Sequence, residues 1–194
     1  MKFSRFFFTE PFKGERGYFK TQRKYEIAKT LFYFAISISL FVAGWIATGS
    51  RLNLLTVVAV LGCLPAGKST VNMIMFLRYS GCSKESQSEI SDHVGSLQGL
   101  YDCIFTSYEK NYQVAHLVVK GDTICGFTED PKFEEQAFYI HLESILKVDG
   151  FKNTSIKIFS ELGKYIERLE QMNQLDTDES HTPGIIQTLK SVSL

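Results

Sequence analysis

The chain has 194 residues, of which 44% are hydrophobic and 22% are charged, and its 21 basic side chains balance its 21 acidic ones. This composition excludes intrinsic disorder, a collagen-like repeat and a disulfide-stapled scaffold. The zero net charge hides an asymmetry. The first 29 residues carry eight basic and three acidic side chains, whereas residues 80–194 carry ten basic and eighteen acidic ones. Such a split is typical of a protein with one end at a membrane and the other in solvent.

Residues 1–29 are basic and rich in aromatic side chains. Phenylalanines, three of them consecutive at Phe6, Phe7 and Phe8, are interleaved with lysines and arginines. Aromatic rings suit the headgroup layer of a bilayer, and cations suit anionic lipids. We therefore expect residues 1–29 to form an interfacial segment on the cytoplasmic leaflet.

Residues 30–78 predict a transmembrane helical hairpin. The 19 residues from Thr30 to Thr48 carry no charge, and as a helix they would span about 28 Å, close to the thickness of a hydrocarbon core. A second uncharged run, Leu52 to Gly67, follows after only three residues. A signal peptide or a buried core helix is the alternative, but the first run starts late, is long, and is followed at once by another apolar run.

The distribution of basic residues predicts the orientation of this hairpin. Four of them flank the entry to the first span, and Arg78 and Lys84 follow the second, whereas the loop between the spans offers Arg51 alone. Basic residues are retained on the cytoplasmic side. We therefore expect a cell-membrane protein with two spans and both termini in the cytoplasm.

The segment from Gly62 to Ser69, GCLPAGKS, matches the phosphate-binding pattern G-x-x-x-x-G-K-[ST]. A nucleotide site here would use Gly62, Gly67, Lys68 and Ser69. The segment lies in the second predicted span, however, and too little chain follows for a doubly wound sheet with a magnesium-binding aspartate. In a membrane helix Lys68 would instead extend its side chain to the cytoplasmic headgroups. Nucleotide binding is therefore kept only as an alternative.

The rest of the chain predicts a linker at 79–86, a compact domain at 87–175 and a flexible tail at 176–194. Apolar residues at helical spacing and β-rich runs give the elements of the domain. We expect a helix at 87–100, strands at 103–108, 112–119 and 123–128, a helix at 130–149, a strand at 154–159 and a final helix from 160. The predicted fold class is α+β, a two-helix transmembrane hairpin followed by a small cytoplasmic α-β-β-β-α-β-α domain.

This order of elements resembles the core of restriction-endonuclease-like folds, and the stretch VAHLVVKGDTICGFTED is similar in rhythm to the second and third strands of nuclease-related domains. The resemblance implies an Asp on one strand and a Glu-x-Lys on the next, which together bind magnesium. In this chain Ala115 stands at the first position and the third strand lacks Glu-x-Lys, so the implied site is degraded. The whole chain also resembles uncharacterised bacterial two-span membrane proteins.

The remaining reactive groups do not form a recognisable site. None of the four cysteines belongs to a C-x-x-C pair, and we expect no metal and no cofactor. His116 and His141 could act as bases, but a histidine packed in a core or on a sheet face is the more common case. The net charge of −8 on the domain disfavours nucleic-acid binding.

The sequence favours a non-enzymatic membrane protein whose hairpin anchors a small acidic module for protein binding or scaffolding. The expected partners are the lipid bilayer and a protein. Small residues at Ala43, Gly44 and Ala47 would also allow close approach of a helix, either from a second copy or from the other half of the hairpin itself. One alternative is a membrane-tethered, metal-dependent nuclease-like enzyme that uses an acidic set such as Asp102, Glu109, Glu129 and Asp130. The other is nucleotide binding at GCLPAGKS.

Overall fold

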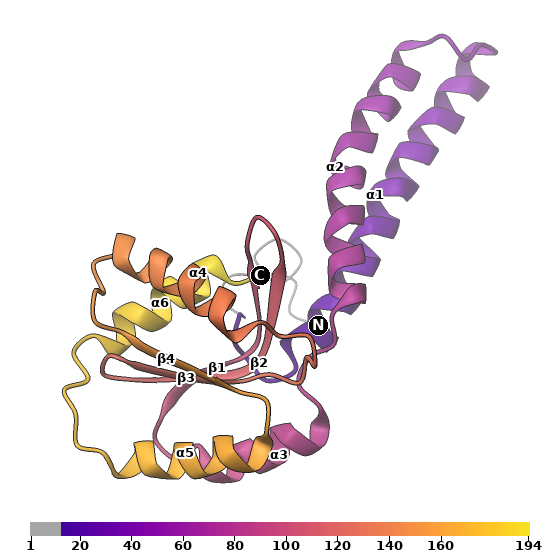
Figure 1. Ribbon diagram of the computed structural model, residues 1–194. Coiled ribbons are helices and arrows are strands. Elements are labelled where there is room, and N and C mark those ends of the chain that lie inside the picture. The colour runs from indigo at the N-terminus through magenta and orange to yellow at the C-terminus, as the bar shows by residue number, and fades with distance from the viewer. Residues whose placement is uncertain (1–12) are drawn as a thin grey trace. The chain divides into compact units, whose positions relative to one another are not determined.

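The computed structural model describes residues 13–194 and shows a mixed α+β protein, as predicted (Figure 1). The described chain contains six helices and one four-stranded sheet. Among the described residues it divides into two units: a helical hairpin, Phe19–Ser80, and a sheet module, which comprises Gly81–Leu194 and residues 13–18. The first part of the predicted interfacial segment, residues 1–12, lies outside the described residues.

The hairpin consists of α1 (Tyr18–Thr48) and α2 (Leu54–Arg78). Asn53 starts α2 by accepting a hydrogen bond from the backbone N–H of Thr56, which satisfies one of the free donors at the helix N-terminus. Since α1 begins at Tyr18, residues 18–29 are its first turns, and the helix is longer than the predicted span.

Polar contacts join the two helices of the hairpin along their interface. The hydroxyl groups of Thr30 and Ser69 lie 2.8 Å apart and are buried. The guanidinium of Arg23 donates to the carbonyl oxygens of Phe76 and Tyr79, both at 3.0 Å, and so satisfies carbonyls that the end of α2 leaves free. These bonds fix which residues of α1 face which residues of α2.

Gly44 belongs to the interior of the hairpin. A Cβ at this position would lie 2.6 Å from the side-chain oxygen of Asn53 and 2.8 Å from Cβ of Leu55. The glycine therefore allows close approach of the hairpin's own second helix. Ala43 and Ala47 are exposed, so an interface with a second copy stays a prediction.

The sheet of the module has the order β1-β2-β3-β4. Strands β1 (Gln98–Thr106), β2 (Asn111–Lys120) and β3 (Thr123–Phe127) form an antiparallel meander, and β4 (Ser155–Phe159) pairs parallel with β3. The parallel pairing requires a crossover, which α4 (Glu135–Val148) provides. In the order β1-β2-β3-β4, strand β4 therefore forms one edge of the sheet.

Helices cover both faces of the sheet, so the module has three layers (Figure 1). On one face α4 and α6 (Thr182–Val192) bury Phe138, Leu142 and Leu189 against the strands. On the other face α3 (Lys84–His93) and α5 (Leu162–Gln174) bury their own apolar side chains against the strands. Each helix presents one apolar stripe to the sheet, which is the usual way in which an α/β layer buries its core.

The edge of β1 that does not pair with β2 is covered by two segments, one from the start and one from the end of the module's chain. The carbonyl of Gly14 accepts a hydrogen bond from the N–H of Tyr101 (3.0 Å), and the N–H of Leu194 donates to the carbonyl of Ile104 (3.0 Å). Gly14 has a φ of +81°, and a Cβ there would lie 2.5 Å from the side chain of Leu100. Only glycine fits so close a contact in this conformation.

The first helix of the module is shorter than predicted. A helix was expected at 87–100, but α3 spans Lys84–His93 and β1 begins at Gln98. Gly95 has a φ of +55° and lies just beyond the helix, where glycine commonly ends a helix in the left-handed conformation. The side-chain amide of Asn173 then donates to the carbonyls of His93 and Val94. The expected linker at 79–86 therefore includes the first residues of α3.

The prediction of a flexible tail at 176–194 is wrong for most of its length, because the tail contains α6. Pro183 lies in the first turn, where its missing N–H costs nothing. Ile185 and Leu189 are fully buried under the sheet. The domain thus extends to the last residues of the chain.

Candidate binding groove beside strand β4

Strand β4 forms the open edge of the sheet. Within the described chain its one paired strand is β3, whereas β1 at the opposite edge is covered. The N–H of Ser155 donates to Asp122 and the carbonyl of Phe159 accepts from Thr128. Because main-chain groups alternate in direction along a strand, Ser155, Lys157 and Phe159 bond toward β3. The main-chain groups of Ile156 and Ile158 consequently point toward the open edge.

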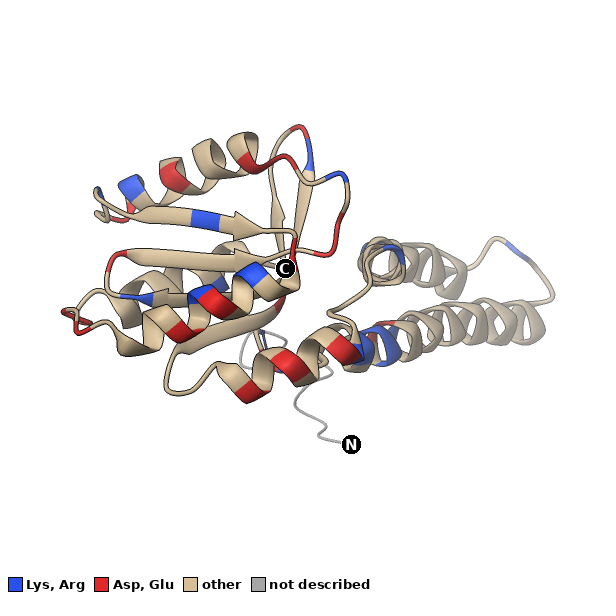
Figure 2. Cartoon of the chain, turned by 60° about the horizontal axis from the view of Figure 1, so that its bottom comes forward, with Lys and Arg blue, Asp and Glu red and all other residues tan. Residues whose placement is uncertain are grey.

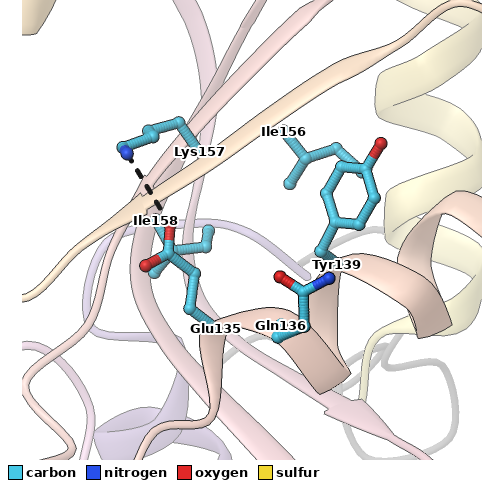
Figure 3. Close-up of a pocket in the computed structure, with 6 residues that line it drawn as sticks. All are labelled: Glu135, Gln136, Tyr139, Ile156, Lys157 and Ile158. Carbon is cyan, nitrogen blue, oxygen red and sulfur yellow. Dashed lines mark ion pairs between the residues drawn. The ribbon is translucent and has the colours of Figure 1, made fainter.

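A groove lies between this edge and α4. It has a volume of about 370 Å³ and is lined by Glu135, Gln136 and Tyr139 of α4 and by Ile156, Lys157 and Ile158 of β4 (Figure 3). Figure 3 shows the ring of Tyr139 beside the side chain of Ile156, with Gln136 next to it. The groove therefore combines an apolar floor with polar groups at its rim, as binding sites commonly do.

One ion pair joins the two elements that line the groove. Nζ of Lys157 lies 4.0 Å from a carboxylate oxygen of Glu135, and these side chains are 61% and 57% exposed. Figure 3 shows Lys157 reaching across the β4 ribbon toward Glu135. A pair this long and this exposed contributes little to stability, about 0–1 kcal/mol. Lys157 can therefore exchange Glu135 for another carboxylate at small cost.

His116, a candidate base, lies in the core and is fully buried. Its Nδ1 lies 2.7 Å from the hydroxyl oxygen of Tyr165, and its ring centroid lies 4.1 Å from that of Tyr101. Burial, with a smaller contribution from Arg16, lowers the pKa of His116 to about 3. The imidazole is neutral at physiological pH and enclosed by aromatic rings, which fits a structural role.

The other candidate groups do not converge on a site. His141 stacks on Tyr112, with ring centroids 6.3 Å apart. The thiols of Cys82, Cys103 and Cys125 are buried, and burial raises the pKa of Cys103 to about 12. A thiol with such a pKa stays protonated and is a poor nucleophile.

The acidic set considered for a nuclease-like site does not form a metal-binding group in the described residues, and three of its members accept hydrogen bonds from the chain itself. Asp102 accepts from the N–H of Cys82 (2.7 Å), Asp130 accepts from the N–H of Lys132 (2.9 Å), and Glu129 accepts from the hydroxyl of Ser83 (2.7 Å). Glu109 is exposed between β1 and β2. In residues 13–194 no group of three or more His, Cys, Asp or Glu side chains is placed to hold a metal ion.

The segment GCLPAGKS lies within α2. Phosphate-binding loops present free backbone N–H groups to the ligand, whereas the N–H groups inside a helix bond to carbonyls one turn earlier. Ser69 bonds to Thr30 and is buried, and Gly67 and Lys68 are exposed on the helix surface. A Cβ at Gly62 would lie 2.8 Å from the hydroxyl oxygen of Ser37, which gives this glycine a packing role between the helices.

Sequence reasoning identified the strand at 154–159 but not the groove beside it. A lysine in the middle of the short apolar run Ile156-Lys157-Ile158 was the available signal, since edge strands often carry a lysine that discourages pairing with other strands. In a search against known proteins, no family model, no curated protein and no solved structure matches the chain.

Proposed function

We propose that the protein is a two-span membrane protein whose sheet module binds a protein partner through the β4 groove, in a non-catalytic role. The hairpin is the anchor in this proposal, and the module is the cytoplasmic recognition domain.

The surface of the hairpin supports the anchoring role. Both helices are long and apolar enough to cross a membrane. Large apolar side chains point outward on α1 and α2, among them Leu31 (65% exposed), Ile46 (80%) and Leu64 (72%). A continuous exposed apolar surface of this kind is costly in water and stable in hydrocarbon.

The charges at the two ends of the hairpin support the orientation. Figure 2 shows basic residues where α1 begins, a long stretch of both helices without charge, and one basic residue in the connecting loop. These are Lys20, Arg23 and Lys24 at one end and Arg51 at the other. The excess of basic residues favours a cytoplasmic location for the end that bears the module.

The observation that carries the binding role is the open edge of β4 next to the groove. Ile156 and Ile158 offer main-chain donors and acceptors at this edge, and the groove offers space for side chains. An extended segment of another protein could add to the sheet as a further strand and insert a side chain beside Tyr139. Strand addition of this kind gives affinity through the main chain and specificity through the pocket.

A pair of substitutions at one position tests this proposal. Ile156→Pro removes the N–H that points toward the open edge without removing a bond to β3, and proline is tolerated on edge strands in this setting. Ile156→Ala removes the same side chain but keeps the N–H. A photo-crosslinking amino acid at Gln136, in the groove of the full-length protein in intact cells, should yield a discrete adduct with the Ala variant and lose it with the Pro variant.

A crosslinker at Gln171, which is exposed on α5, provides the control for nonspecific capture. Equal adducts from both positions, or an adduct that survives Ile156→Pro, would contradict binding through the edge of β4. The methyl signal of the buried Ile124 should be unchanged in both variants, which would show that the core of the module is intact.

A further inference from the structure

We infer that the strand received at β4 carries an acidic residue between two apolar residues, and that Lys157 recognises the acidic side chain. This inference deepens the proposed function and rests on it. It specifies the chemistry of the partner, whereas the proposed function specifies only where and how a partner binds.

The pattern of β4 determines the pattern of a strand that pairs with it. Ile156 and Ile158 pack on the face that α4 covers, and Lys157 lies between them on the other face. In a neighbouring strand, side chains beside those of Ile156 and Ile158 would face the groove, and the residue between them would lie level with Lys157. Cross-strand pairs of apolar residues and of opposite charges are favourable. A strand that complements the apolar-basic-apolar pattern of β4 therefore carries the pattern apolar-acidic-apolar.

The size of the groove fits the apolar part of this pattern. A volume of about 370 Å³ over Ile156, Ile158 and the ring of Tyr139 can take a branched or aromatic side chain from the added strand. Glu135 and Gln136 remain at the rim. An apolar side chain would cover the floor of the groove without leaving a buried polar group unpaired.

The same charge pattern disfavours a second copy of this chain as the occupant. If β4 paired antiparallel with β4 of another copy, with Ile156 opposite Ile158, then Lys157 would lie opposite Lys157. Like charges directly opposite each other are destabilising in a sheet, and a central lysine is a common means of preventing edge-to-edge association. A carboxylate in the same place would instead replace Glu135 as the partner of Lys157.

Peptide binding to the full-length protein in detergent micelles tests the inference. The probes are two capped hexapeptides, TVEVTG and TVKVTG, and the readout is the shift of the Ile156 and Ile158 methyl signals in isoleucine-labelled protein. We expect TVEVTG to bind about three- to tenfold more tightly than TVKVTG, because the change from Glu to Lys replaces an attractive cross-strand charge pair with a repulsive one. Lys157→Glu should reverse the order of the two peptides.

A matched variant separates local recognition from the overall charge of the module. Lys190→Glu makes the same charge change on an exposed position of α6, which packs against β1 and β2, toward the edge of the sheet opposite β4. It should leave the preference for TVEVTG unchanged. A preference that changes equally in both variants would overturn the role of Lys157.

The remaining outcomes distinguish this inference from the proposed function. Equal affinities for both peptides, with binding lost in Ile156→Pro, would overturn the acidic specificity and leave strand addition standing. Shifts at Ile156 that depend on protein concentration without peptide would identify a second copy as the occupant and overturn the inference. Absence of shifts with either peptide at millimolar concentration would overturn it as well, whereas the crosslinking experiment would still decide the proposed function.

Discussion

At the scale of single residues, the most unusual group of the module is the buried imidazole of His116. It is the one histidine in the described chain that is fully buried, and its Nε2 has no hydrogen-bond partner there. The groups that face it are Tyr101 of β1, Tyr165 of α5 and Arg16 from the segment before α1. Burial and the positive charge of Arg16 both disfavour the imidazolium. The neutral form is therefore part of the folded state.

This burial predicts that acid destabilises the module. In the unfolded chain His116 has an ordinary pKa near 6.5, whereas in the folded module burial lowers it to about 3. Between these values the unfolded state binds the additional proton, so stability is lost as the pH falls below 6.5. The loss is about 2 kcal/mol between pH 7 and pH 5. Urea unfolding of the full chain in detergent, followed by the Ile124 methyl signal, should show it.

Substitution of the histidine provides the control for this prediction. His116→Gln retains a hydrogen-bonding group for Tyr165 and should remove most of the difference in stability between pH 7 and pH 5. His141→Gln, at a partly exposed position of α4, should retain it. If His116→Gln shows the same loss between pH 7 and pH 5 as the parent protein, protonation of His116 is not the cause.

At the scale of elements, local sequence patterns predicted the strands better than the helix ends. The predicted strands at 112–119, 123–128 and 154–159 closely match β2, β3 and β4, because β-branched and aromatic runs bounded by turn residues are informative over short windows. The switch from α3 to β1 was missed because Leu97 continues the helical spacing of Ile90 and Val94. The helix ends instead at Gly95, which has a positive φ, and at carbonyls that bond to Asn173.

Helix α6 lies outside the domain predicted from the sequence, so substitutions in it show how far the stability of the module depends on this helix. Leu189 is fully buried against the sheet, so Leu189→Ala should destabilise the module by about 2–5 kcal/mol, as for other large-to-small substitutions in a core. The exposed neighbour Lys190 provides the matched control, since Lys190→Ala should change stability by less than about 0.5 kcal/mol. Equal stability of the two variants would mean that α6 is not part of the core.

The groove could not be predicted at this scale, because it depends on which strand is last in the sheet. That order is set by the parallel pairing of β3 with β4 through the α4 crossover, a contact between distant segments. The run Ile156-Lys157-Ile158 is compatible with a central or an outer strand. Only the pairing makes Lys157 an edge residue and brings Glu135 and Tyr139 of α4 beside it.

At the scale of the whole molecule, the uncharged part of the hairpin matches the dimensions of a bilayer. Thr30 of α1 and Ser69 of α2 face each other, so the uncharged residues between this contact and the connecting loop lie side by side at the same level in the two helices. From Thr30 to the end of α1 at Thr48 the helix rises about 27 Å, close to a hydrocarbon core of about 30 Å. Lys29 and Lys68 adjoin this level, so in a membrane-spanning hairpin their side chains would reach the headgroups.

This arrangement predicts which parts of the protein a reagent can reach in cells. In intact cells a membrane-impermeant maleimide should label Ser50→Cys, in the connecting loop, and should not label Ser180→Cys, an exposed position of the module. Permeabilisation should make Ser180→Cys reactive while the buried cysteines of the module stay protected. Labelling of Ser180→Cys alone in intact cells would reverse the orientation, and labelling of both would contradict a hairpin that separates loop from module. The loop carries Arg51 alone, whereas Lys20, Arg23 and Lys24 cluster at the other end of the hairpin. We therefore expect labelling of Ser50→Cys without labelling of Ser180→Cys in intact cells.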